Sequence, residues 1–442
     1  MNKIIKISIF LLFANSASFS QNILSLKDCL NLGFKNSKEL VISNSKIISS
    51  EARITEATSQ LLPQLKFSAG YMRLSDIPPF EVTVPFYPLP IKLADVILNN
   101  YNLKLSLQQP LFTGFRLISL KNAAEYNKRA TETDLIKDKN ELALNIEASY
   151  WNFYKAKLMI KLMDDNLQQA EQHVVDTKNL LENGLATKND LLKLQVQYAN
   201  AKLQQIDAQN NVDLTRSTLN KAIGLPLTNL TEIEMAEITP TGEALNLNEL
   251  ITEARNNRSE LKSLDLRINA GQENIKAARS GWFPAISVIG DYYYSRPNSR
   301  IQPPLDQFKG TWDIGINFTW DIWNWGNTSA QTEEAEQTVL QSKTSLEQVK
   351  DAIELEVNQN YLALNYAKEK LDVNKIAIEQ AKENYRTFQD KYNVQLATST
   401  DLIDAETSLL QAETNYNNSL VDYQISKIKL EKSLGRPLYN NK

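Results

Sequence analysis

The chain has 442 residues, a formal net charge of -4 and 23% charged residues, so it offers no basic surface for nucleic acid. Its single cysteine, Cys29, excludes an intrachain disulfide and is expected to be a small buried residue. Only 13 glycines and 14 prolines interrupt the sequence, which leaves room for long helices.

Residues 1–20 have the pattern of a secretory signal peptide. Lys3 and Lys6 supply the positive start, residues 7–14 form a short apolar core, and small residues suited to cleavage follow. No cysteine stands at the expected cleavage point to carry a lipid anchor. Because no later run of about 18 apolar residues occurs, a membrane-spanning part would have to consist of β-strands.

The remaining sequence contains two copies of one unit. Residues of the first copy recur 221 positions later near its start and 211 positions later near its end. A constant spacing over such long stretches indicates an internal repeat. We therefore predict a first repeat at 21–227, a linker at 228–244 and a second repeat at 245–442.

Each repeat predicts the same series of elements: a short helix, a longer helix, a strand, a proline-rich loop, a second strand and two long helices. In the first repeat the helices fall at about 26–34 and 38–61, the strands at about 64–72 and 101–109, and the long helices at about 116–182 and 188–223. In the second, the strands fall at about 285–293 and 311–320 and the long helices at about 327–394 and 399–434. The proline-rich loops are expected to lie on the side of the strands away from the long helices.

The long helices carry a seam residue every three or four positions, as in the run from Leu142 to Leu181. A sustained seven-residue period predicts a coiled-coil seam. Large residues alternate along it with small or polar ones, which lets neighbouring helices approach closely. About 67 residues at about 1.5 Å each would reach about 100 Å, too long for an ordinary globular core.

The strands alternate apolar and polar residues over about 9–11 positions, the length and pattern of transmembrane β-strands. The positions expected to face lipid are Leu65, Phe67, Tyr71, Leu103, Leu105, Leu107, Ile286, Val288, Trp312, Ile314, Ile316, Phe318 and Trp320. Four strands cannot close a barrel, and open edges cannot face lipid. Two, three or four copies of the chain would therefore have to share one barrel.

In this order, and doubled, the motifs resemble those of the TolC-type outer membrane efflux proteins, also called outer membrane factors. The residues that carry the resemblance are the stops at Pro63 and Pro284, the strand-to-helix segments 109–115 and 321–326, the helix turns 184–191 and 395–402, and the Gly-x-Pro endings at Gly224 and Gly435. The resemblance covers nearly the whole chain after the signal segment.

The resemblance implies a homotrimer in the Gram-negative outer membrane, with most of its mass in the periplasm. The fold is then mainly α with a small β part: a long antiparallel coiled-coil barrel of helices that continues into a transmembrane β-barrel, with four strands from each subunit. The implied role is a passive exit duct of a tripartite efflux or type I secretion system. The implied partners are a periplasmic adaptor (membrane fusion) protein, an inner-membrane RND-type or ABC-type pump, and outer-membrane lipid.

The resemblance also assigns a periplasmic gate, whose family positions match Asp190, Tyr392, Asp401 and Asp404. In a trimer, Asp401 and Asp404 would place six carboxylates around one axis, although an aspartate at a helix start also serves as a cap. The arginine that ties the family's tyrosine and aspartate together falls on Ala397. Either Lys188 or another residue takes its place, or the mouth is held closed in a different way. The expected adaptor-docking tips are Gly184, Leu185, Ala186, Thr187, Gln395, Leu396, Ala397 and Thr398.

Catalytic chemistry is not expected. The only histidine, His173, together with one cysteine cannot build a zinc site or a Ser-His-Asp arrangement, and no glycine-rich phosphate loop occurs. We therefore predict no catalytic, cofactor-binding or metal site. The alternative hypothesis is a structural or adhesive coiled-coil protein at the cell surface, which would explain the heptads but not the four amphipathic strands.

Overall fold

The structure is a computed structural model that describes residues 23–94, 96–235, 245–394 and 396–439. The predicted signal peptide, residues 236–244 of the predicted linker and Gln395 lie outside the described residues. The chain forms two compact units, and each combines parts of both sequence repeats. The first unit contains Lys139–Asn257, Leu355–Lys442 and the residues up to Lys38; the second contains Glu39–Asp138 and Arg258–Glu354.

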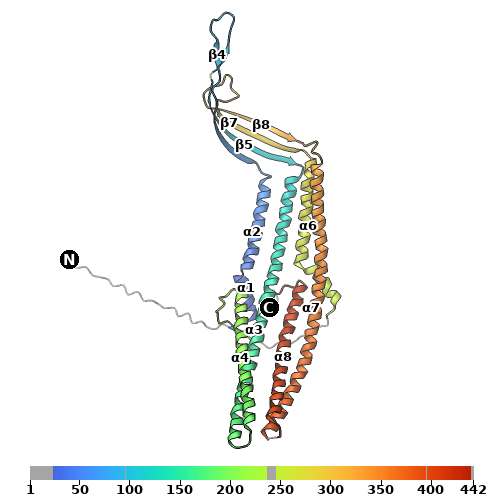
Figure 1. Ribbon diagram of the computed structural model, residues 1–442. Coiled ribbons are helices and arrows are strands. Elements are labelled where there is room, and N and C mark those ends of the chain that lie inside the picture. The colour runs from blue at the N-terminus through green and yellow to red at the C-terminus, as the bar shows by residue number, and fades with distance from the viewer. Residues whose placement is uncertain (1–22, 95, 236–244, 395, 440–442) are drawn as a thin grey trace, which may run out of the picture. The chain divides into compact units, whose positions relative to one another are not determined.

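Most of the described chain is helical (Figure 1). The helices are α1 Leu26–Asn36, α2 Lys38–Ser59, α3 Arg116–Glu182, α4 Lys188–Ala222, α5 Leu247–Asn257, α6 Ser259–Ala278, the 3-10 turn η1 Arg279–Trp282, α7 Asn327–Asn393 and α8 Ser399–Ser433. The long helices begin and end close to the predicted positions. Among the described residues, no helix has an apolar stretch long enough to cross a bilayer.

The core of the first unit is the predicted coiled-coil seam. Ile146, Phe153 and Ala156 of α3 are almost fully buried, as are Val357 of α7 and Leu402 of α8. Small seam residues permit this close packing because they leave room for the large side chain opposite. The heptad pattern thus locates the buried stripe of each long helix.

The Gly-x-Pro ending of the first repeat has a steric cause. Gly224 follows α4 with φ +74, a conformation that glycine adopts without strain. A Cβ at this position would lie 2.4 Å from Cβ of Asn36, so a larger residue would also collide with the end of α1.

Four antiparallel strands form the main sheet, which belongs to the second unit. They are β2 Gln64–Arg73, β5 Asn99–Thr113, β7 Ala285–Arg296 and β8 Lys309–Thr319, hydrogen-bonded in the order β2-β5-β7-β8. Strand β5 continues past its predicted end. Pro110 has no backbone N–H to donate, and an irregularity in register between Pro110 and Phe112 accommodates it while the pairing with β7 continues.

Two short strand pairs were not predicted. In the first proline-rich loop, β3 Phe80–Val82 pairs with β4 Ile91–Ala94. Elsewhere β1 Ile23–Leu24 pairs in parallel with β6 Glu232–Ile233, within the segment predicted as a linker. Strands of two to four residues show too few alternations to be recognised from sequence.

Candidate functional site

The register of the sheet places the predicted lipid-facing residues on one face. Phe67 lies opposite Leu105, Leu105 opposite Tyr292, and Tyr292 opposite Trp312. In antiparallel strands, directly opposed residues project to the same side. The same face continues two residues further along the strands, where it carries Leu65, Leu107 and Ile314. It then continues with Val288 opposite Ile316 and Ile286 opposite Phe318.

This apolar face is uncovered in the single chain. Ile316 is 74% exposed, and Leu65, Phe67, Trp312 and Ile314 are also largely exposed. An exposed apolar surface of this kind marks contact with another protein or with lipid. Trp320 is the exception to the predicted arrangement, because β8 ends at Thr319 and the side chain therefore lies beyond the strand.

The opposite face of the sheet is polar and carries ion pairs. Lys104 Nζ lies 2.9 Å from Asp291 Oδ2 on the neighbouring strand, and Asp291 is only 9% exposed. On the outer strand β8, the Asp313 carboxylate accepts a hydrogen bond from the Arg300 guanidinium. One face of the sheet thus suits an apolar medium and the other suits water.

Within the part of the chain that the structure describes, the two outer strands, β2 and β8, each pair on one side only. A row of unpaired backbone groups cannot be left in lipid, where no water satisfies it. The free edges therefore need partners wherever the sheet meets lipid.

The second region of interest is the pair of turns that join α3 to α4 and α7 to α8 in the first unit. Each turn leads into a helix through the same hydrogen-bonded cap. Asp190 Oδ2 accepts from the backbone N and the hydroxyl of Thr187, at 3.1 and 2.6 Å, and Asp401 Oδ2 accepts from the same groups of Thr398 at 2.9 and 2.7 Å. Threonine followed three residues later by an acidic residue is the sequence signature of this capping box.

These hydrogen bonds hold both carboxylates in the ionised form. The Thr187 hydroxyl and then the Ser399 hydroxyl hold the pKa of Asp190 below its usual range. The Thr398 hydroxyl and backbone N–H lower the pKa of Asp401 in the same way. Two of the four predicted gate residues, Asp190 and Asp401, are therefore also the acidic members of capping boxes.

The two helical hairpins are joined by three side-chain contacts near the turns. Ser399 Oγ donates to Asp190 Oδ1 at 2.9 Å, and Lys193 Nζ donates to Thr400 Oγ1 at 3.1 Å. The hydroxyl of Tyr392 lies 3.2 Å from Oγ1 of Thr177, and Thr177 is almost fully buried. The sequence did not point to Ser399 or Thr177 because these contacts join residues more than 200 positions apart.

The predicted gate residues thus do not form one cluster in this chain. Asp190 and Tyr392 each bind the opposite hairpin through a hydroxyl-bearing residue rather than through each other. Asp404 is exposed on the first turns of α8. Among the described residues, no hydrogen bond of the Lys188 side chain is seen in this region, so Lys193 is the lysine that reaches the other hairpin.

The docking candidates occupy the turns themselves. Gly184 has φ +74, and a Cβ at this position would meet no atom within 4 Å, while the neighbouring Leu185 is exposed. Leu396 is 78% exposed on the second turn, whereas Gln395 lies outside the described residues. Each turn therefore presents an uncovered leucine.

Residues 33–225 and 250–436 each match the family described as "Outer membrane efflux protein". This chain belongs to that family. The two matched segments fall on the two predicted repeats, and the family resemblance found in the sequence motifs is confirmed. Members of the family are passive channels of the Gram-negative outer membrane, with a large periplasmic helical domain.

Individual relatives are distant but cover most of the chain. The outer membrane protein TolC of Vibrio cholerae is 22% identical over 95% of this chain and 92% of its own length. TolC of Escherichia coli K12 is 23% identical, over 87% of this chain and 76% of its own length. The toxin and drug export protein A of Aggregatibacter actinomycetemcomitans is 21% identical over 70% of this chain.

Solved structures support the fold. CusC superimposes with a TM-score of 0.76 at 17% identity, covering 93% of this chain and 92% of that one. The open state of the Neisseria gonorrhoeae MtrE outer membrane channel gives a TM-score of 0.75 at 18% identity, covering 93% and 89%. The predicted fold class is confirmed, and the adhesive-rod alternative is set aside because the family match spans both repeats.

Proposed function

We propose that three copies of this chain close one β-barrel and act together as the exit duct of a tripartite efflux or type I secretion system. The observation that carries the proposal is the open four-stranded sheet, with an exposed apolar face and two edges that have no partner strand among the described residues. Three such sheets supply enough strands for a closed barrel, whereas one does not.

The test is to purify the mature protein from outer membranes and to measure ion conduction in planar lipid bilayers. A salt-resistant, membrane-bound trimer that conducts ions is expected. A water-soluble monomer that leaves the bilayer insulating would contradict the proposal.

The mouth of this duct is proposed to lie at the two helix turns, with Asp190, Tyr392, Asp401 and Asp404 as its gate residues. Three side-chain hydrogen bonds near the turns, between the α3–α4 and α7–α8 hairpins, support this location of the mouth. Separating the hairpins would break them all. Ala397 leaves no arginine at the family's latch position, and the Ser399–Asp190 hydrogen bond supplies a connection between the hairpins instead.

The partners of the duct are proposed to be a periplasmic adaptor and an inner-membrane pump of the RND or ABC class. The surfaces that support adaptor docking are the uncovered Leu185 and Leu396 on the two turns. An apolar side chain at the centre of a polar rim is a common docking anchor. A photo-crosslinker at position 185 is expected to capture the adaptor in cells, whereas one at the exposed position 207 of α4 is not; capture from both or neither would contradict docking at the tips.

A further inference from the structure

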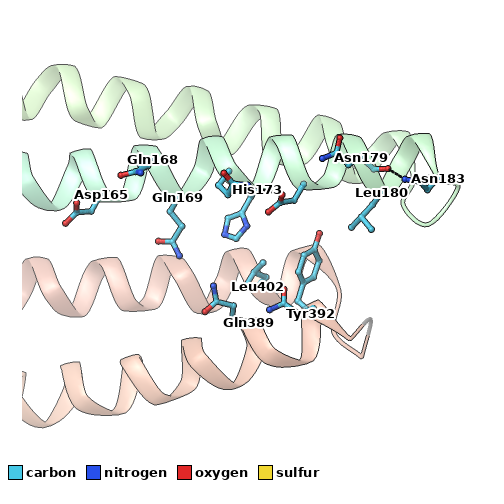
Figure 2. A pocket seen from close by; sticks show the side chains of 13 residues that line it. Asp165, Gln168, Gln169, His173, Asn179, Leu180, Asn183, Gln389, Tyr392 and Leu402 are labelled. Carbon is cyan, nitrogen blue, oxygen red and sulfur yellow. Dashed lines mark hydrogen bonds between the residues drawn. The ribbon is translucent and has the colours of Figure 1, made fainter.

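A buried acid–base pair connects the two helical hairpins a short distance from the turns. His173 lies on α3 and Glu406 lies on α8, both in the first unit. Their Nε2 and Oε2 atoms are 3.8 Å apart, and the two side chains are only 12% and 4% exposed. Figure 2 shows His173 pointing from α3 toward the α7–α8 hairpin.

The polar atoms of this pair are buried without hydrogen-bond partners among the described residues. They are Nε2 of His173 and both carboxylate oxygens of Glu406. A buried carboxylate that accepts no hydrogen bond is a costly arrangement. A single proton held between the imidazole and the carboxyl group would satisfy one atom on each side, and a small side-chain movement would bring them within hydrogen-bond distance.

Most other charged and titratable groups near the pair contact residues other than Glu406. Asp176 of α3, which accepts from Gln172 at 2.9 Å, is the acidic neighbour of His173. Asp165 lines the pocket of Figure 2, which His173 also lines. From α7, the Tyr385 hydroxyl accepts from Gln169, and Tyr392 faces Thr177. Further along, Lys382 and Glu413 pair with each other at 3.6 Å.

From α4, Lys193 reaches Thr400 at the start of α8 and not Glu406. Among the described residues, no lysine or arginine makes an ion pair with Glu406. His173 is therefore the titratable group placed to share a proton with this carboxyl group.

We propose that His173 and Glu406 form a proton-sensitive clasp that holds the α7–α8 hairpin against α3 while the pair contains one proton and weakens when that proton is lost. The inference rests on the proposed channel function, because the hairpins it joins form the proposed mouth. Loss of the proton leaves an ionised carboxylate buried between α3 and α8. Moving α8 away from α3 would let water reach it.

The direction of the effect follows from burial. Burial raises the pKa of Glu406 from 4.5 to about 7, while burial lowers the pKa of His173 against the opposing effect of Asp176. Between these values of 4.5 and about 7, the folded chain binds more protons at Glu406 than the unfolded chain does. The contribution of Glu406 is therefore lost as the pH rises through about 7. His173 acts in the opposite direction, because its lowered pKa means that the folded chain binds fewer protons there in acid. The contact is most stable between these two titrations and weakens as the pH rises through about 7.

Conductance of the purified trimer in planar bilayers, measured from about pH 5.5 to 8.5, tests the clasp. The wild-type channel is expected to open as the pH rises, with a midpoint near 7. Glu406→Gln keeps the size of the side chain and can hydrogen-bond to His173 without titrating, so it should remain in the low-conductance state and lose the pH transition. Glu413→Gln, on the same helix, is the matched control and should follow the wild type.

The clasp is overturned if the wild-type channel conducts equally at every pH, or if Glu406→Gln keeps the wild-type transition. Absence of conduction in every variant would instead overturn the channel function itself. Hydrogen exchange on the same trimers gives a second readout: amides in the first turns of α8 should lose protection above neutral pH in the wild type but not in Glu406→Gln. Equal protection in both proteins at all pH values would also overturn the clasp.

Discussion

Asp401 and Asp404 lie one helical turn apart on α8, yet their carboxylates have different surroundings. Asp401 accepts two hydrogen bonds from the N-cap residue Thr398, whereas Asp404 is exposed and its carboxylate shows no hydrogen bond among the described residues. Replacing Asp401 by alanine would therefore remove half of the capping box as well as a charge. Asp404 is the cleaner position at which to test the proposed gate.

We expect Asp404→Asn to weaken block of the channel by multivalent cations by about tenfold, because the change removes one charge per subunit around a shared axis. The measurement is the concentration of a multivalent cation that halves the single-channel current in planar bilayers. Asp207→Asn removes an exposed charge from the middle of α4 and should leave block unchanged. Equal block in wild type and Asp404→Asn would remove Asp404 from the gate.

The two helical hairpins are the elements whose separation would open the mouth, and the Ser399–Asp190 hydrogen bond is one of the contacts that join them near the turns. A hydrogen bond to a charged group contributes about 1.5–3 kcal/mol when its partner is removed. Ser399 is buried, so water does not readily replace its hydroxyl. The hairpin contact therefore depends on this one side chain to a measurable degree.

Ser399→Ala is expected to raise the fraction of time that the channel is open by about tenfold, the factor that corresponds to about 1.4 kcal/mol. The measurement is single-channel recording at neutral pH. Ser408→Ala is the control, because the hydroxyl of Ser408 donates to the backbone oxygen of Asp404 within α8, at 2.7 Å, and makes no other hydrogen bond among the described residues. A Ser399→Ala channel as rarely open as the Ser408→Ala channel would show that this hydrogen bond does not hold the mouth.

Assembly of the whole molecule depends on which face of the sheet meets lipid. Adjacent residues on β8 separate the two faces cleanly: Ile316 lies on the apolar face and Asn317 on the polar one. A lysine on the lipid side of a β-barrel costs about 2–4 kcal/mol near the middle of the bilayer, whereas one that faces the water-filled interior costs little.

Ile316→Lys is therefore expected to reduce the amount of trimer in outer membranes severalfold, and Asn317→Lys to leave it near the wild-type amount. Quantifying heat-dissociable trimer on gels of the outer-membrane fraction provides the measurement. The reverse order of the two variants would mean that the faces of the sheet have been assigned the wrong way round.

Much of this architecture is encoded in local periodicity. The run from Leu142 through Phe153 shows the heptad spacing that α3 buries, and the alternation from Ile314 to Phe318 shows the exposed face of β8. Both patterns repeat with the helical or strand period, which is why they can be recognised without a structure. The β3–β4 hairpin was missed because prolines at 85, 88 and 90 interrupt any alternation between its strands.

The candidate site was only partly predictable for a different reason. Thr187 and Asp190, or Thr398 and Asp401, stand three residues apart, so a capping box can be recognised in the sequence. Ser399 with Asp190, Thr177 with Tyr392, and His173 with Glu406 are brought together only by the packing of α3 against α7 and α8. The spacing of those residues in the sequence does not predict these contacts.

The sequence by itself determined that this protein is built from two repeats of long heptad helices and amphipathic strands, because side-chain period and backbone period must agree within each element. Only the tertiary structure decided which strands pair, which edges remain open and which polar side chains meet between the hairpins. These are contacts between distant segments, and their identity depends on how the elements pack rather than on the pattern within any one of them.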